Sequence, residues 1–337
     1  MSDKYCTVKD IAEASGVSLS TVSYALRNNP RIPVDTRLRI QKVAERLGYR
    51  RNPHISALMS VIGRGRKVRN VENIALIWPQ GTRSDIQTVR FCCDITRGVE
   101  NRARALNLGV EKFWMQEDSL SGSRMTTILT TRYIRGLLFA PALQGSSLSL
   151  GLEWDRFVTV VLGHAQWTPE MHRCLSNQYN AVRVCLEQLA LSGAKRTAAI
   201  LSGDINRRTD YAQEAAFLTH HSQPANARKL IFFVSAGALT GIFPWLKTNK
   251  VDSVIFGSNQ IYNSCLAMNK SALLKLRSVT LDWTPDNKHV PGIKFRHDLI
   301  AESAVDLLVS QLYMNEVGVP ERARRLSLRG DWMPGLL

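Results

Sequence analysis

The stretch 19–26, near the N-terminus, has one apolar face, and the side chains on its other face are Leu19, Ser20 and Tyr24. The Ser20 and Tyr24 hydroxyls can hydrogen-bond the edges of bases, and Leu19 can contact the methyl group of thymine. Such side chains specify a DNA sequence when they lie near the start of a helix that enters the major groove. We therefore predict that these three residues read bases.

A second group of polar and basic side chains is suited to DNA phosphates. Phosphate contacts fix the register of a protein on the duplex and carry no sequence information themselves. The alternative is a helical domain that contacts only proteins, and the local positive charge weighs against it. The predicted phosphate contacts are Ser18, Thr21, Ser23, Asn28, Arg31 and Thr36.

Three short helices are predicted to position these residues. Thr7 with Asp10 resembles a helix start, and Gly16 ends this first helix. Ser18 caps a second helix with the buried face Val22, Ala25 and Leu26. A short helix, a turn containing glycine and another short helix form the helix-turn-helix pattern. The third helix starts near Pro33, ends at Gly48 and carries apolar residues at the spacing of one face, namely Ile40, Val43, Ala44 and Leu47.

The charge of the chain is concentrated around these helices. The 337 residues include 44 Lys and Arg against 28 Asp and Glu, with a pI near 9.9. Residues 1–70 carry 14 basic and five acidic side chains, so over half of the excess lies in about a fifth of the chain. A field of this sign attracts nucleic acid or an anionic membrane surface.

Residues 7–26, TVKDIAEASGVSLSTVSYAL, resemble the DNA-binding headpiece of the lactose-repressor (LacI/GalR) family. Thr36-Arg37, Ala44, Leu47-Gly48-Tyr49 and Asn52 continue the resemblance over about sixty residues. It implies a homodimer on a pseudo-palindromic operator, with Thr7, Tyr49 and Asn52 among the DNA-binding residues. Members usually carry Arg or His where this chain has Tyr24, so the operator preference differs.

Residues 51–71 are predicted to be a hinge helix and a basic linker. By resemblance to the family, the hinge folds on DNA and Leu58 wedges into the minor groove, where such a side chain kinks the duplex. Ile55 either deepens this wedge or packs on the partner hinge. An ordinary amphipathic linker helix is the alternative. The run 63–69, GRGRKVR, is either a solvated linker or a track along the phosphates.

From Asn73 onward short apolar runs alternate with helical patterns, which favours parallel sheets covered on both faces. One helix is predicted from Ile86 to Leu106 and another from Ala181 to Ser192. About 265 residues with this pattern suggest two α/β lobes and a cleft. The predicted strands are Ile74–Trp78, Val110–Trp114, Leu137–Ala140, Val158–Leu162, Thr197–Leu201, Leu230–Val234, Ser253–Phe256 and Ser278–Leu281.

The family resemblance continues more faintly here, at 193–200 and at 298–312. It implies an effector domain like the periplasmic binding proteins, in which three strands join two lobes around a ligand. The expected organisation is a headpiece at 1–50, the hinge and linker at 51–71, and the bilobal domain at 72–337. Its first lobe takes about 72–175 and a C-terminal segment, and its second about 176–293.

The expected cleft departs from the family pattern at several positions. Asn259-Gln260 stands where Asn-Asp is usual, and Gln213 replaces an Arg. Asp282 matches an acid that accepts hydrogen bonds from sugar hydroxyls. Carboxylates, amides and aromatic rings bind polyols, so the expected effector is a carbohydrate or a derivative, unlike the common hexoses, or else the pocket is degenerate. For each candidate a core or loop role stays open; they are Trp78, His164, Asn259, Asp282 and Phe295.

Competing functions receive little support from the sequence. An enzyme, a free-standing solute-binding protein and an architectural DNA protein are the rivals. None of the common catalytic or nucleotide-binding motifs occurs, and no cofactor or metal is expected. The six cysteines have no metal-ligand spacing and are predicted to be buried thiols. No signal peptide or membrane span is evident, so we expect a cytoplasmic regulator, a dimer rather than a tetramer, whose effector shifts its affinity for DNA.

Overall fold

The computed structural model describes residues 8–26, 32–47, 49, 72–142, 147–234 and 239–335. By its internal contacts the chain divides into two compact units, one of residues 1–71 with 310–316 and the other of 72–309 with 317–337. The hinge positions Asn52, Ile55 and Leu58 lie outside the described residues, as do Thr7, Asn28 and Arg31. What the sequence predicts for these six stays a prediction.

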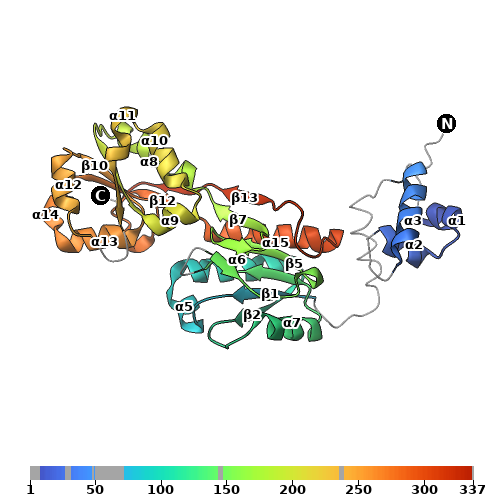
Figure 1. The fold of residues 1–337 in the computed structure, drawn as a ribbon. Coiled ribbons are helices and arrows are strands. Elements are labelled where there is room, and N and C mark those ends of the chain that lie inside the picture. The colour runs from blue at the N-terminus through green and yellow to red at the C-terminus, as the bar shows by residue number, and fades with distance from the viewer. Residues whose placement is uncertain are drawn as a thin grey trace. The chain divides into compact units, whose positions relative to one another are not determined.

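Residues 8–26 and 32–47 of the N-terminal unit, the part of it before residue 49 that the structure describes, form the helices α1 (Val8–Ser15), α2 (Leu19–Leu26) and α3 (Val34–Arg46) (Figure 1). Gly16 has φ +66°, a left-handed conformation that glycine adopts without strain, and it ends α1. The Ser18 hydroxyl accepts a hydrogen bond from the Thr21 amide at 3.2 Å, which caps α2 as predicted. The helix-turn-helix geometry therefore follows from local sequence.

The core of this unit is small. Its buried side chains are Ile11, Ala12, Val22, Ala25, Ile40 and Ala44, with Val43, Leu26 and Tyr49 partly buried against them. The prediction for Leu47 was wrong. The helix ends at Arg46, and Leu47 then serves as its C-cap with 38% of its surface exposed. Because the helix stops before Leu47, this last residue of the apolar pattern does not join the core.

The larger unit holds two parallel sheets, which confirms the predicted two-lobed α/β fold. Among the described residues the first sheet has the order β13-β7-β5-β3-β1-β2, and every strand pair in it is parallel. Its core is lined by buried side chains such as Ile77, Phe139 and Val161. The strands are β1 (Asn73–Trp78), β2 (Gly109–Trp114), β3 (Gly136–Phe139), β5 (Val158–Leu162), β7 (His172–Ser176) and β13 (Arg325–Leu328).

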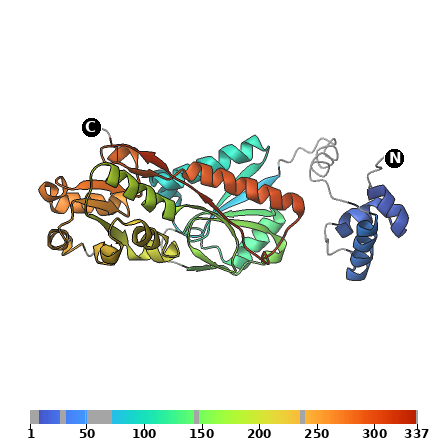
Figure 2. The ribbon, with the colours of Figure 1, turned by 90° about the horizontal axis from the view of Figure 1, so that it is seen from above.

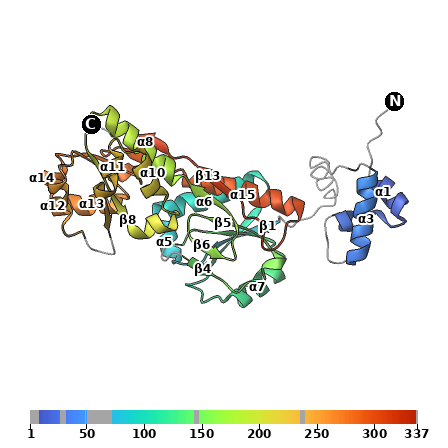
Figure 3. The same cartoon turned by 45° about the horizontal axis from the view of Figure 1, so that its top comes forward.

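The second sheet has the order β14-β12-β11-β10-β8-β9, and within it only β14 is antiparallel to its neighbour in the described part of the chain. A separate two-stranded sheet pairs β4 (Ser147–Ser149) with β6 (Gln166–Thr168) (Figure 3). The strands of the second sheet are β8 (Thr197–Ser202), β9 (Ile231–Val234), β10 (Ser253–Phe256), β11 (Arg277–Thr280), β12 (Gly292–Lys294) and β14 (Asp331–Met333).

Helices cover these sheets, and the last long one, α15 (His297–Met314), lies beside α6 (Arg90–Ala105) (Figures 1 and 2). Arg102 and Asp306 join the two helices at 2.6 Å. The other helices are α5 (Arg83–Thr88), α7 (Gly122–Thr131), α8 (Gln178–Leu191), α9 (Gly203–Arg208), α10 (Ala212–His220), α11 (Pro224–Ala227), α12 (Ile242–Thr248), α13 (Asn259–Met268) and α14 (Lys270–Leu273).

One predicted helix of this unit was wrong. The pattern from Ile86 to Leu106 forms two helices, α5 and α6, because the chain takes the extended conformation at Val89. Thr82 and Asp85 form a capping box that starts α5 separately. None of the helices in the described ranges is long and apolar enough to cross a lipid bilayer.

Candidate functional site

The outer face of α2 presents the residues predicted to read bases. Leu19 and Tyr24 are exposed over 54% and 37% of their surfaces, and Ser20 is also exposed. Val22 and Ala25 are fully buried on the opposite face. The helix therefore separates an apolar side that holds it in place from a polar side that is available to a partner.

The hydroxyl groups at the start of α2 form a connected cluster. Ser18 Oγ lies 2.8 Å from both Ser20 Oγ and Thr21 Oγ1, while it accepts the Thr21 amide. Because of this cap, the first turn of α2 keeps its backbone donors directed at the cluster, an arrangement that favours anions such as phosphate. Ser23 and Thr36 are half-buried.

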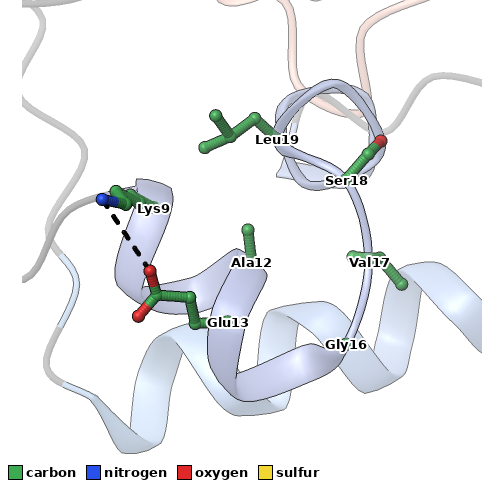
Figure 4. Close-up of a pocket in the computed structure, with 7 residues that line it drawn as sticks. All are labelled: Lys9, Ala12, Glu13, Gly16, Val17, Ser18 and Leu19. Carbon is green, nitrogen blue, oxygen red and sulfur yellow. Dashed lines mark ion pairs between the residues drawn. The ribbon is translucent and has the colours of Figure 1, made fainter.

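An open hollow of about 460 Å³ lies at the turn between α1 and α2 (Figure 4). Lys9 and Glu13 of α1 form an exposed ion pair at 4.0 Å on one side of it, and Leu19 projects from α2 toward α1. Gly16 and Val17 make the turn itself. The hollow is thus the groove between the two helices of the motif. It is too open to enclose a small ligand.

Tyr49 is the one remaining headpiece candidate that is described. Its amide donates to the Ala44 carbonyl at 2.9 Å, and its ring is partly buried against the headpiece core. These contacts show that Tyr49 packs the end of α3. A role in DNA binding stays a prediction.

In the larger unit, a pocket of about 290 Å³ lies where the carboxyl ends of strands from both sheets meet. Ligands of open parallel sheets bind at such strand ends. Apolar side chains including Phe91, Leu162 and Ile205 form much of its wall. Its polar lining residues are His164, Ser176, Gln178, Arg208, Thr209 and His297.

A chain of hydrogen bonds crosses this pocket from the first sheet to α10. Ser176 Oγ lies 3.0 Å from His164 Nε2 and accepts from Gln178 Nε2 at 2.9 Å. Gln178 Oε1 in turn accepts from Gln213 Nε2 at 2.9 Å. Gln213 is 1% exposed. Gln213 is therefore a buried amide in a network behind the pocket wall.

Four of the five predicted cleft residues do not line this pocket. Only His164 does. Asp282 lies close enough to His297 to affect its charge, and the Phe295 ring lies 6.1 Å from that of His297. Trp78 is 1% exposed at the end of β1. The Asn259 side-chain Nδ2 donates to Thr284 Oγ1 at 2.9 Å, and its backbone N–H donates to the Asp282 carboxylate. Asp282 and Phe295 are thus neighbours of the lining residue His297. For Trp78 and Asn259 the described residues show no such contact with a lining residue.

Sequence reasoning missed Arg208 and His297. Arg208 ends α9, the short helix after β8, and His297 begins α15 after β12. Both follow the carboxyl end of a strand, so the predicted strand Thr197–Leu201 could have pointed to the residues after it. The α9 helix was not predicted, since six residues give too short a pattern.

Burial shifts the pKa values of ionisable groups in and beside the pocket. Burial, followed by the positive charges of Arg208 and Arg173, lowers the pKa of His164 to about 4. Burial also lowers the pKa of His297, against the opposing effect of Asp282, and raises the pKa of Asp282. At neutral pH His164 is therefore an uncharged hydrogen-bonding group.

We predict that His164 makes the larger unit less stable in acid. An unfolded chain binds a proton below pH 6.5, whereas folded His164 resists protonation down to about pH 4, so stability falls as the pH decreases through this window. At about pH 5.5 the loss due to this group is on the order of 1 kcal/mol. Urea unfolding at about pH 7.5 and 5.5 should show a smaller pH dependence in His164→Gln. An equal dependence in both proteins would contradict the prediction.

The sequence of the N-terminal residues is similar to that of a known protein family. Residues 7–52 match the sequence model of the bacterial regulatory proteins of the lacI family. The HTH-type transcriptional regulator DegA of Bacillus subtilis (strain 168) is 26% identical over 147 residues, which cover 44% of this chain and 40% of DegA. The chain spans about half or less of the length of the curated relatives it matches.

Solved structures resemble nearly the whole chain. A transcriptional regulator CelR–cellobiose complex has a TM-score of 0.55 at 16% identity and covers 98% of each chain. The lac repressor dimer bound to operator and the anti-inducer ONPF has a TM-score of 0.54 at 15% identity, again with 98% of each chain. At these identities the likeness shows the fold, which is that of a helix-turn-helix headpiece with a bilobal α/β domain.

Proposed function

We propose that the chain, whose residues 7–52 match the sequence model of the lacI family, is a sequence-specific DNA-binding transcription regulator of that family, a repressor rather than an enzyme. The observation that carries the proposal is the outer face of α2. Leu19, Ser20 and Tyr24 are exposed there while the opposite face is fixed in the headpiece core. A helix held in this way can enter the major groove with those side chains on base edges.

The proposed operator is pseudo-palindromic and the proposed active form is a homodimer. Two headpieces would then occupy half-sites about one helical turn apart. One solved structure with this fold, the lac repressor, is a dimer bound to its operator, which makes this arrangement the one to test first. We keep the organisation expected from sequence, with a headpiece at 1–50, a hinge and linker at 51–71 and an effector domain at 72–337.

The pocket between the two sheets is the proposed effector site. Its mixture of apolar wall and hydrogen-bonding groups is typical of small-molecule sites. CelR is described with cellobiose bound, which supports a carbohydrate or a derivative as the effector of this chain. Binding there would change the relation of the lobes and so the DNA affinity, by about 5–150-fold if the coupling is typical.

The test is selection of bound sequences from a random DNA library by the full chain at about 150 mM salt, where binding to phosphates alone is weak. We expect enrichment of one pseudo-palindrome, with a preference over bulk DNA of about 10³-fold or more. Enrichment of no sequence, with and without a panel of sugars, would overturn the proposal.

Tyr24→Ala should change which sequence is selected. Removing a side chain that contacts base edges relaxes the preference at one position of each half-site and weakens binding to the selected DNA by about 5–10-fold. Thr36→Val provides the contrast, because loss of a phosphate contact lowers the affinity for all sequences alike. If Tyr24→Ala enriches the wild-type sequence at every position, Tyr24 does not read bases.

A further inference from the structure

Arg208 places a positive charge in the wall of the pocket without a partner of opposite charge. It is half-buried at the end of α9, and its Nη2 donates to the Ala142 carbonyl at 2.8 Å. The acid of the same helix, Asp204, pairs with the neighbouring Arg207 instead. Within the described residues, Arg208 forms no ion pair with a carboxylate.

A second arginine behind the pocket is in the same situation. Arg173 of β7 is 4% exposed, and its Nη1 donates to the Ala165 carbonyl at 3.1 Å while its Nε is buried with no hydrogen-bond acceptor. The nearby acids are already engaged, because Arg325 binds both Glu170 and Asp210, at 3.1 and 2.7 Å. Desolvation lowers the pKa of both Arg173 and Arg208.

Two partly desolvated guanidinium groups beside a neutral histidine are costly without a counter-charge. Proteins accept this cost at sites that bind an anion, since arginine binds carboxylate and phosphate with paired hydrogen bonds. Ser176, Gln178 and Thr209 line the same pocket and supply further hydrogen-bonding groups. Among the described residues no carboxylate pairs with Arg208 or Arg173, so a negatively charged group from outside the chain would match this arrangement.

The rest of the pocket limits the size and character of the ligand. Its volume of about 290 Å³ is at the small end of the range for ligand sites, which is ~300–1,000 Å³. Phe91, Leu162 and Ile300 line it with apolar surface. His297 lines it too, and its charged neighbour is Asp282, which would repel an anion. The anionic group therefore belongs at Arg208 and the body of the ligand against the apolar wall.

We propose that the effector is a small acid, with one carboxylate or phosphate group bound by Arg208 and a compact body of about one ring. This inference rests on the proposed function, which makes the pocket the effector site. It replaces the neutral sugar that the fold alone suggests. It also explains why the chain can lack the family's Arg at position 213, since the positive charge of the site comes from a different helix.

The test compares acids with their neutral counterparts, using calorimetry and thermal unfolding of the full chain. The probes are D-glucuronate, D-glucose 6-phosphate and cyclohexanecarboxylate, with D-glucose and cyclohexanecarboxamide as counterparts and inorganic phosphate alone. We expect at least one acid to bind ten times more tightly than its counterpart. The separate carboxylate and phosphate probes distinguish the two anionic groups.

Variants at neighbouring positions of α9 assign the preference to one side chain. Arg208→Gln should remove the preference for the acid and Arg208→Lys should keep part of it. Arg207→Gln, an exposed position on the same helix, should keep all of it. If Arg208→Gln does not fold, Arg208→Lys still retains the positive charge. A partial loss of the preference in Arg208→Lys, with no loss in Arg207→Gln, then assigns the preference to position 208.

The inference would be overturned by acids and neutral compounds that bind alike, by no binding of any probe, or by an undiminished preference in Arg208→Gln. A neutral sugar that binds and alters DNA affinity would overturn it while leaving the proposed function intact. Failure of the DNA selection would overturn the proposed function. It would not change the acid preference of the pocket, because ligand binding by the larger unit is measured without DNA.

Discussion

Ile40→Asn should abolish specific DNA binding while the larger unit remains folded. Ile40 is fully buried in a small core to which the described residues contribute six buried side chains. The substitution loses the burial of an isoleucine, about 1.5–3 kcal/mol, and leaves an amide without partners, about 1–3 kcal/mol. A single core of this size supplies about 3–5 kcal/mol in total, so the headpiece would be largely unfolded.

Leu38→Asn is the matched control for this prediction. Leu38 lies on the same helix, α3, but is 51% exposed, so the same substitution there removes little buried surface. Both variants are uncharged, which leaves the attraction to phosphate unchanged. Two quantities are measured for each variant: its affinity for the selected DNA and the temperature of the main thermal transition, which reports on the larger unit. Full binding by Ile40→Asn would show that α1–α3 do not carry the DNA-binding activity.

The headpiece was largely predictable because local signals determine it. Ser18 and Gly16 are the types that a helix start and a left-handed turn require, and both act as predicted. Leu47 was misplaced because periodicity gives the face of a residue but not the point at which the helix stops. The DNA-contact residues of α2 could be proposed only as those that the core leaves outside, and others, such as Tyr49, only from the family resemblance.

Strands of the larger unit were predictable where both faces are buried. Val158–Leu162 and Ser253–Phe256 are apolar except for one small polar residue each and are buried along their whole length, and the structure has them with the predicted bounds. The strands His172–Ser176 and Arg325–Leu328 were missed, because each mixes charged and apolar residues. They pair with each other in parallel although about 150 positions separate them, which no local pattern reveals.

The cleft was the least predictable part, since its residues come from separate strand ends. His164 could be found because it follows a clear strand, Val158–Leu162. Arg208 and His297 were not found, because their positions depend on how the second sheet faces the first. Trp78 is the last residue of a clear strand, yet it is buried within its own lobe. A strand end therefore marks a candidate, and only the packing of the lobes selects among candidates.

Gly98→Ala should destabilise the larger unit and weaken binding in the pocket. A Cβ at Gly98 on α6 would lie 2.3 Å from the Asp298 carbonyl oxygen of α15 and 3.0 Å from the Ala301 Cβ. Alanine gains about 1 kcal/mol of helix propensity, but overpacking against a backbone atom costs about 1–3 kcal/mol or more. We expect a net loss of about 2 kcal/mol and a melting temperature lower by about 4–8 °C. Because His297 begins α15 and lines the pocket, ligand affinity should fall about tenfold.

Gly203→Ala separates this packing effect from the general effect of alanine in a helix. Gly203 begins α9, and the nearest atom to a Cβ placed there is the end of the Arg207 side chain at 3.7 Å. Its melting temperature should therefore change by no more than about 2 °C. If Gly98→Ala melted at the wild-type temperature or above, α6 and α15 could separate without cost, and α15 would not hold His297 in place. A lower melting temperature together with weaker ligand binding, in Gly98→Ala alone, is the result that ties the α6–α15 contact to the pocket.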